Sequence, residues 1–93
     1  MPVYAIAQGR VHDTKKHDAY VAAAVPTLPA EAKLLSFDLD PEVIEGPVSH
    51  PRTVIIEFPT RESFLAWYNS PVYQKVRHLR LESVEGTMVL AKA

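Results

Sequence analysis

The carboxylate best placed for acid–base chemistry in this sequence is Glu57. It lies within the apolar run Thr-Val-Ile-Ile-Glu-Phe at residues 53–58. A carboxylate held away from water has a raised pKa, which suits a general base, unless an arginine such as Arg10 or Arg52 pairs with it. Glu57 is therefore either a catalytic base in a cavity or half of a structural ion pair, and we favour the ion pair.

Histidine can act as an acid or a base near neutral pH, and the chain contains His12, His17, His50 and His78. His17 is the second candidate base if its predicted helix turns it toward a cavity, although a solvated helix histidine is the commoner case. A metal site needs two or three converging ligands, and these spacings do not supply them. The chain has no cysteine, which excludes a thiolate metal site, and we expect neither a metal site nor a cofactor.

Other polar and aromatic side chains could bind a small organic molecule. Strand alternation predicts one polar set on a common sheet face, namely Tyr4, Gln8, Arg10 and Asp38. A second set surrounds a break between two predicted helices, namely Trp67, Tyr68, Tyr73 and Arg77. Helical spacing makes these aromatic rings more typical of packing than of a substrate pocket. Arg77 and Arg80 are three residues apart on one predicted helix face, and they could bind a carboxylate or face the acidic stretch 38–45.

The composition describes an ordinary small globular protein. The 93 residues are 47% hydrophobic and 23% charged, which predicts a single domain over residues 1–93. A net charge of -1 gives no positive field to attract nucleic acid or an anionic membrane. No apolar run reaches the ~18 residues of a membrane span, and no export signal precedes the first strand. We therefore expect a cytoplasmic protein that binds neither nucleic acid nor membrane.

Strands are predicted at residues 3–11, 33–39, 53–58 and 87–91, with Glu85-Gly86 as a break before the last one. Asp13, Thr60 and Ser70 are the predicted helix N-caps, and Pro71 follows the last of them at the first helical position. This β-α-β-β-α-β order is that of an α+β, ferredoxin-like fold, with helices on one face of a four-stranded antiparallel sheet. The small residues at odd positions of strand 3–11 suit a face that helices approach closely.

The other face of this sheet must be polar or must meet a partner. If Val54, Ile56 and Phe58 face the helices, then Ile55 and Glu57 face away from them. Strand 33–39 alternates in the same way, with Leu35, Phe37 and Leu39 on one face and Leu34, Ser36 and Asp38 on the other. The outward face therefore mixes apolar and polar side chains, which predicts a homodimer.

The chain resembles a known family at the run Glu-Phe-Pro-Thr-Arg-Glu of residues 57–62 and at Trp-Tyr-Asn-Ser-Pro-Val-Tyr-Gln of residues 67–74. This is domain of unknown function family 1330, and further matches at residues 4–8, 42–46 and 85–86 extend the resemblance over nearly the whole chain. The resemblance implies a dimeric α/β barrel in which two four-stranded sheets meet. The wider superfamily includes cofactor-free monooxygenases, muconolactone isomerase and haem-dependent enzymes.

The chain departs from the family pattern after its second predicted strand. Members usually have Arg-Gly-Gly there, whereas residues 37–40 read Phe-Asp-Leu-Asp. An acid in place of a cavity arginine inverts the local charge, which argues against an anionic ligand inherited from the family.

Two hypotheses of different class follow. In the first, a small dimeric α/β-barrel protein binds a small organic molecule between sheet and helices, with cofactor-free acid–base or monooxygenase-like chemistry. Glu57 or His17 is then the base, and Tyr4, Gln8 and Arg10 orient the substrate. In the second, the protein is a non-catalytic homodimer that binds a metabolite or serves as an interaction module. Both hypotheses are open at this point.

Overall fold

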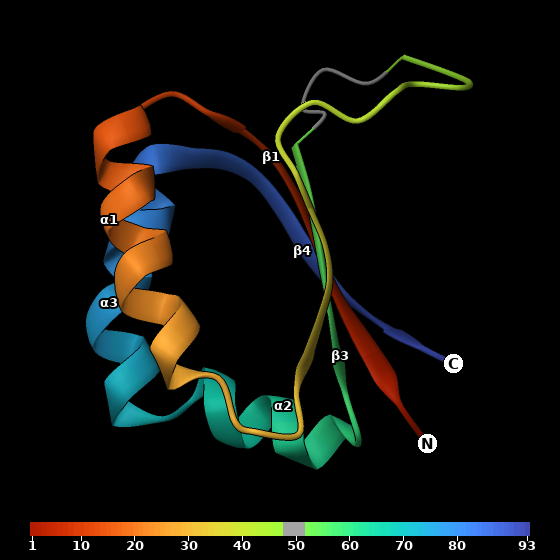
Figure 1. Ribbon diagram of the computed structural model, residues 1–93, viewed down its shortest axis with the longest axis vertical. Coiled ribbons are helices and arrows are strands. Elements are labelled where there is room, and N and C mark those ends of the chain that lie inside the picture. The colour runs from red at the N-terminus through yellow and green to blue at the C-terminus, as the bar shows by residue number, and fades with distance from the viewer. Residues whose placement is uncertain (48–51) are drawn as a thin grey trace.

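The computed structural model describes residues 1–47 and 52–93, so His50 lies outside the described residues. Four strands form one antiparallel sheet in the order β2-β3-β1-β4 (Figure 1). The strands are β1 (Val3–Val11), β2 (Lys33–Asp38), β3 (Arg52–Phe58) and β4 (Val84–Lys92). The helices are α1 (Thr14–Ala24), α2 (Arg61–Tyr68) and α3 (Pro71–Ser83), and a 3-10 turn, Val25–Thr27, follows α1.

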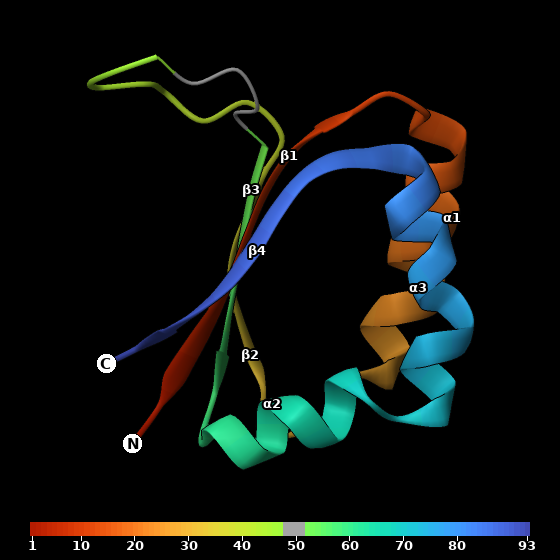
Figure 2. The ribbon, with the colours of Figure 1, turned by 180° about the vertical axis from the view of Figure 1, so that it is seen from behind.

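All three helices lie on one face of the sheet, and the ferredoxin-like fold is confirmed. Figure 2 shows α1 and α3 side by side, opposite the sheet, while α2 closes one end of the space between the two layers. The order β-α-β-β-α-α-β contains one helix more than the expected β-α-β-β-α-β order. The reason is that helix α2 ends before Asn69 and a new helix, α3, begins at Pro71.

Polar side chains begin each helix where the sequence predicted. The Asp13 carboxylate accepts a hydrogen bond of 3.0 Å from the Lys16 N–H. Thr60 and Ser63 satisfy each other's backbone N–H groups in a capping box at α2. Ser70 caps α3, and Pro71 occupies a first-turn position where its missing N–H costs nothing.

The predicted break at Glu85-Gly86 is wrong, because β4 begins at Val84 and runs through both residues. Gly86 pairs with Gly9 of β1. A Cβ atom at Gly86 would overlap the backbone of Gln8 and Gly9. The glycine is therefore needed for the close approach of two strands and marks no turn.

The alternation expected for residues 33–39 is wrong as well, because β2 contains a bulge. Leu34 pairs with Ile56 and Phe37 pairs with Val54, with the register shift between Leu34 and Ser36. Cross-strand partners share a face, so Leu34 and Phe37 both face the helices.

The packed core is confined to the end of the molecule near α2. Its buried members are Val3, Ala5, Ala24, Phe58, Phe64, Trp67 and Tyr73. The rings of Phe58 and Phe64 meet edge to face with their centroids 5.3 Å apart. Farther from α2, side chains leave the space between the layers unfilled, and there the pocket described next is found.

Candidate functional site

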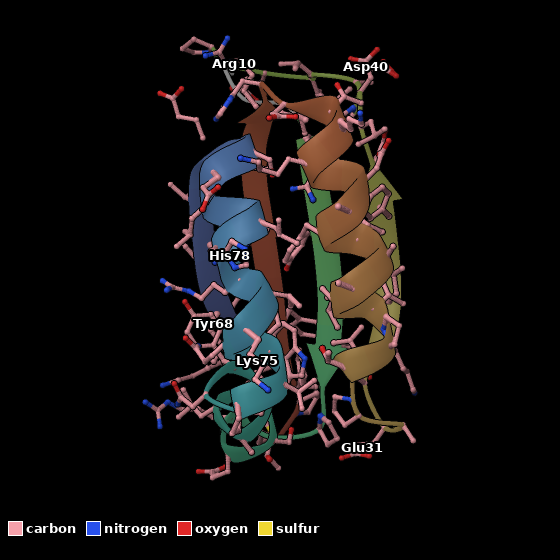
Figure 3. All side chains as sticks on the ribbon, turned by 90° about the vertical axis from the view of Figure 1, so that its left-hand side faces the viewer. Arg10, Glu31, Asp40, Tyr68, Lys75 and His78 are labelled. Carbon is pink, nitrogen blue, oxygen red and sulfur yellow. The ribbon has the colours of Figure 1, made fainter. Side chains whose placement is uncertain are left out.

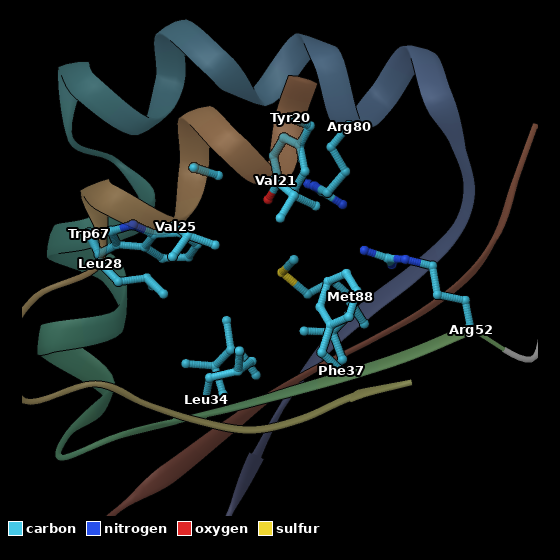
Figure 4. A pocket seen from close by; sticks show the side chains of 15 residues that line it. Tyr20, Val21, Val25, Leu28, Leu34, Phe37, Arg52, Trp67, Arg80 and Met88 are labelled. Carbon is cyan, nitrogen blue, oxygen red and sulfur yellow. The ribbon is translucent and has the colours of Figure 1, made fainter. Parts of the chain in front are cut away.

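A pocket lies between the inner face of the sheet and helix α1 (Figure 4). The centre of a water molecule can occupy about 70 Å³ of it, which is room for a small organic ring or several waters. Most of its walls are apolar side chains, among them Val21, Leu28, Leu34, Phe37, Ile56 and Met88. Apolar walls with a few polar groups are typical of small-molecule sites.

The small residues of β1 have a different effect from the one expected. Ala5 and Ala7 do not bring the helices close to the sheet; both line the pocket. Because their side chains end at Cβ, they leave the space that a larger residue would fill.

Arg52 is the most deeply buried charged residue among those described. It faces the pocket because it is the partner of Gly9 and is in phase with Val54 on β3. The residue is only 5% exposed, and its Nε has no hydrogen-bond partner. Its guanidinium carbon lies 5.6 Å from the centre of the Phe37 ring. Burial lowers the pKa of Arg52, although an arginine stays protonated at any physiological pH.

Arg80 reaches the same pocket from α3, and its Nε is also buried without a partner. Figure 4 shows the Arg52 and Arg80 side chains pointing into the same space from opposite layers. The ion pairs of the described residues are Arg10–Glu85, Lys16–Glu82 and Lys33–Glu57, so neither pocket arginine has a carboxylate partner there. Residues 48–51 contain no carboxylate side chain. Within the part of the chain that the structure describes, no carboxylate thus forms an ion pair with the arginines of the pocket.

Tyr20 completes the polar end of the pocket. Its hydroxyl lies 2.9 Å from the hydroxyl of Tyr73, which is fully buried. Burial raises the pKa of Tyr20 above its usual value, and the neighbouring Tyr73 raises it further. Tyr20 is therefore a neutral hydroxyl that can donate or accept a hydrogen bond.

His17 lies one turn before Tyr20 on α1 and is 3% exposed, with no partner for its Nε2. Its ring centre is 6.2 Å from that of Phe37 and 6.5 Å from that of Tyr20. Burial lowers the pKa of His17, and the positive charge of Arg52 lowers it further. The imidazole is neutral at pH 7 and can accept a proton. Its assignment as a base stays a prediction.

Glu57 lies on the other face of the sheet. Its carboxylate is 3.8 Å from the Lys33 ammonium group. Neither of the two arginines considered as partners pairs with Glu57. The Arg10 guanidinium lies 3.2 Å from the Glu85 carboxylate, and Arg52 faces the pocket. The role of Glu57 as a base stays a prediction, and the structure places it outside the pocket.

The predicted substrate-binding residues fall into separate groups. Tyr4, Gln8 and Arg10 share the outer face with Glu57, where the Gln8 amide donates a 3.1 Å hydrogen bond to Thr53. Asp38 ends β2, and its carboxylate accepts a hydrogen bond from the Asp40 N–H. Of this polar set, Arg10 lines an open depression together with His17, Asp18 and Arg52 at the end of the sheet.

Of the aromatic set, Trp67 lines the pocket. Tyr73 does not line it, but its hydroxyl is hydrogen-bonded to that of Tyr20, which does. The Trp67 indole donates a 2.9 Å hydrogen bond to Thr27. Tyr68 accepts a 2.8 Å hydrogen bond from the Nε of Arg77. Figure 3 shows Tyr68 on the side of α3 away from α1, so this pair is remote from the pocket.

Sequence reasoning missed Tyr20 and Arg52 as pocket residues, and it considered Arg80 only together with Arg77, as a group that could bind a carboxylate. A signal for Arg52 existed, because it continues the two-residue period of Val54 and Ile56. Arg80 likewise follows Tyr73 at a seven-residue helical spacing.

Within residues 1–47 and 52–93, no three histidine or acidic residues come together to hold a metal ion. The same residues include no helix long and apolar enough to cross a membrane.

Fold and pocket together define a small ferredoxin-like protein with a mostly apolar internal pocket. The family model described as "Domain of unknown function (DUF1330)" matches residues 2–93, and the chain belongs to this family. The resemblance found in the sequence is thereby confirmed.

Solved structures share the fold at low sequence identity. RPA0582 from Rhodopseudomonas palustris, described as a protein of unknown function, has a TM-score of 0.83 at 17% identity, over 99% of this chain and 82% of that one. A dimeric ferredoxin-like protein from Thermobifida fusca has a TM-score of 0.68 at 17% identity, over 100% and 92%. SnoaB from Streptomyces nogalater, a cofactor-independent oxygenase, has a TM-score of 0.67 at 12% identity, over 99% and 92%. No curated protein is significantly similar to the chain.

Proposed function

We propose that the protein is a homodimer that binds a small, largely apolar organic molecule in the pocket between sheet and helices and transfers a proton to or from it without a cofactor. The observation that carries this proposal is the pocket itself, in which apolar walls end at a cluster of buried polar groups. The cluster consists of Tyr20, Arg52 and Arg80, and His17 lines an adjoining depression that shares Arg52 with the pocket.

The apolar walls favour a ligand with a ring or a short aliphatic body. Phe37, Met88 and Leu34 offer surface that gains free energy when it is covered by another apolar group. The polar cluster at one end would orient such a molecule. Perturbed titratable groups in a pocket are typical of active sites.

His17, in the adjoining depression that Arg52 also lines, is the best candidate for the base. Its neutral imidazole can take a proton from the bound molecule, leaving the electron pair on that molecule as an anion. Arg52 and Arg80 are placed to stabilise the resulting negative charge. Glu57 cannot do this within one chain, because the sheet lies between it and the pocket.

Oxygenation of the bound molecule is the second candidate reaction. It is favoured by two proteins of the same fold, SnoaB, a cofactor-independent oxygenase, and a putative antibiotic biosynthesis monooxygenase from Nitrosomonas europaea. Both share only the fold with this chain, so proton transfer is preferred on the residues present.

The outer face of the sheet supports the proposed dimer. Ile6 and Val89 are paired at its centre, and Val89 is 55% exposed in the single chain. Gln8, Arg10 and Glu57 surround them with polar groups. An apolar centre with a polar rim is typical of an interface between proteins. Structural neighbours from Thermobifida fusca and Bacteroides fragilis are described as dimeric.

Filling the pocket tests the proposal. We would titrate the protein with benzamide and follow backbone amide signals by NMR. The signals that shift are expected to be those of pocket residues such as Phe37 and Met88. Ala7→Leu fills the pocket and is expected to abolish these shifts. Ala19→Leu makes the same change on the exposed face of α1 and is the matched control. Equal binding by both variants would overturn the proposed site.

A further inference from the structure

We infer that the molecule bound in this pocket is an organic anion, whose acidic group is held by Arg52 and Arg80 while its apolar body lies against the pocket walls. This inference rests on the proposed function, because it names the class of ligand for the same pocket. It takes in carboxylates and ionised phenols or enols.

The first argument is charge. Two guanidinium groups enter the pocket, and no carboxylate among the described residues pairs with either of them. Buried charges in proteins are generally paired, because an unpaired charge in an apolar setting is costly. Arg52, at 5% exposure, departs from that rule unless something else supplies the negative charge.

The second argument is hydrogen bonding. The Nε–H groups of both Arg52 and Arg80 are buried and have no acceptor. Most buried donors in proteins have a partner, so two orphaned donors at one end of a pocket indicate a missing acceptor. A ligand oxygen carrying negative charge would satisfy both donors at once, in the kind of charge-assisted hydrogen bond that arginine makes best.

The third argument concerns what the neighbouring groups allow. Tyr20 is neutral and can donate its proton to an anion if Tyr73 donates to the Tyr20 oxygen. His17 carries no charge at pH 7 and does not compete for the anion. The remaining walls are apolar, so a bare inorganic anion would leave most of the pocket without a favourable contact.

Glu42 and Glu45, in the segment between β2 and β3, do not serve as this anion. Glu42 and Glu45 instead line a separate depression, beside Gln8 and Thr53 on the outer side of the sheet. The pocket faces the opposite side, toward the helices. No described carboxylate forms an ion pair with Arg52 or Arg80, so we assign the negative charge to a ligand from outside the chain.

Two nearly isosteric probes test this inference, benzoate and the neutral benzamide. Binding is measured by NMR in chloride-free buffer, through the side-chain Nε–H signals of Arg52 and Arg80 as well as the backbone amides. Benzoate is expected to bind about tenfold more tightly than benzamide, because hydrogen bonds to a charged group are the stronger ones. Benzoate is also expected to shift both Nε–H signals.

Variants locate the effect. Arg52→Gln and Arg80→Gln are each expected to reduce benzoate affinity to the level of benzamide, with benzamide affinity little changed. Arg61→Gln removes an exposed arginine on α2 and is expected to leave both affinities unchanged. The benzamide measurement also shows whether each variant still has a folded pocket.

Each result separates the two proposals. Equal affinity for benzoate and benzamide would overturn the anion inference and leave the pocket proposal standing. If neither probe shifts pocket signals at millimolar concentration, the proposed function itself fails. Inorganic phosphate binding as tightly as benzoate would show a site for simple anions and would overturn the need for an apolar body.

Discussion

Arg52 shows most clearly how a single residue links stability to function in this protein. A buried arginine without a carboxylate partner destabilises the ligand-free fold, because the desolvation of its charge is not repaid by an ion pair. Proteins retain such destabilising groups at functional sites, where a loss of stability is tolerated because the group is needed for activity. The pocket is therefore expected to be the least stable part of the sheet until a ligand binds.

Replacing this charge with an apolar side chain of similar length should stabilise the ligand-free protein. Arg52→Met is expected to raise the free energy of unfolding by about 1–4 kcal/mol, the range seen when buried ion pairs are replaced by packed apolar residues. Scanning calorimetry at fixed protein concentration measures the change as a higher Tm. Arg61→Met is the control and should leave Tm unchanged. A lower Tm for Arg52→Met would show that the charge is compensated in a way that we have not recognised.

His17 predicts a pH dependence of stability. Its pKa is lowered in the folded state, first by burial and then by Arg52, with Asp18 opposing them. The unfolded chain therefore binds the proton more tightly, and His17 weakens the fold as pH falls below about 6.5, the ordinary pKa of histidine. Above that pH it contributes no pH dependence.

Urea unfolding at about pH 7 and about pH 5 measures this effect, since the two values bracket the ordinary histidine pKa. His17→Gln is expected to lose less stability between them than the wild type does. The control is His78→Gln, at an exposed position on α3, and it should keep the wild-type pH dependence. Identical pH profiles for His17→Gln and the wild type would contradict the assignment of a neutral buried imidazole.

At the scale of elements, the close approach of β1 and β4 depends on Gly86. Gly86→Ala is expected to destabilise the protein by about 2 kcal/mol or more, because its Cβ would overlap backbone atoms of the paired strand, which cannot move independently. Gly9→Ala is the comparison, since its nearest contact is a side-chain methyl of Val84 and a smaller loss is expected. Chemical denaturation measures both. A milder effect at Gly86 than at Gly9 would contradict the packing described.

The sequence was sufficient to predict most elements and their order, because local signals set them. Asp13, Thr60 and Ser70 begin the three helices through hydrogen bonds to backbone groups within three residues. Gly86 and the bulge in β2 were misjudged because both depend on the neighbouring strand, which a local pattern does not include. A glycine required by a close strand partner and a glycine at a turn have the same local signature.

The candidate site was predictable only in part, for a similar reason. Of the residues named, Trp67 lines the pocket, whereas His17 lines the adjoining depression that shares Arg52 with it. Glu57 drew attention as an acid in an apolar strand, yet alternation alone places it on the face opposite Val54 and Ile56. Residues 37–40 contain acids where members of the family have Arg-Gly-Gly, and this difference argued against an anionic ligand. The pocket charge comes from Arg52 on the next strand and Arg80 on α3, which are brought together only by the packing of sheet against helices.

At the scale of the whole molecule, the sheet separates two surfaces with different roles. Its inner face forms the pocket, and its outer face is the proposed dimer interface, centred on Ile6 and Val89. Light scattering during size-exclusion chromatography is expected to give twice the 10.4 kDa mass of one chain. Ile6→Glu places a charge at the centre of this interface and should yield monomers at micromolar concentration. A wild-type monomer, or an undisturbed dimer of the variant, would contradict this interface.

A crystal structure of the protein with benzoate tests the central claim most directly. We predict the carboxylate between the guanidinium groups of Arg52 and Arg80, and the ring against Phe37 and Met88. Two chains are expected to face each other through their sheets in the same crystal. Benzoate bound on the outer face beside Arg10 would contradict the account. So would a pocket without benzoate in crystals soaked in a saturating concentration of it.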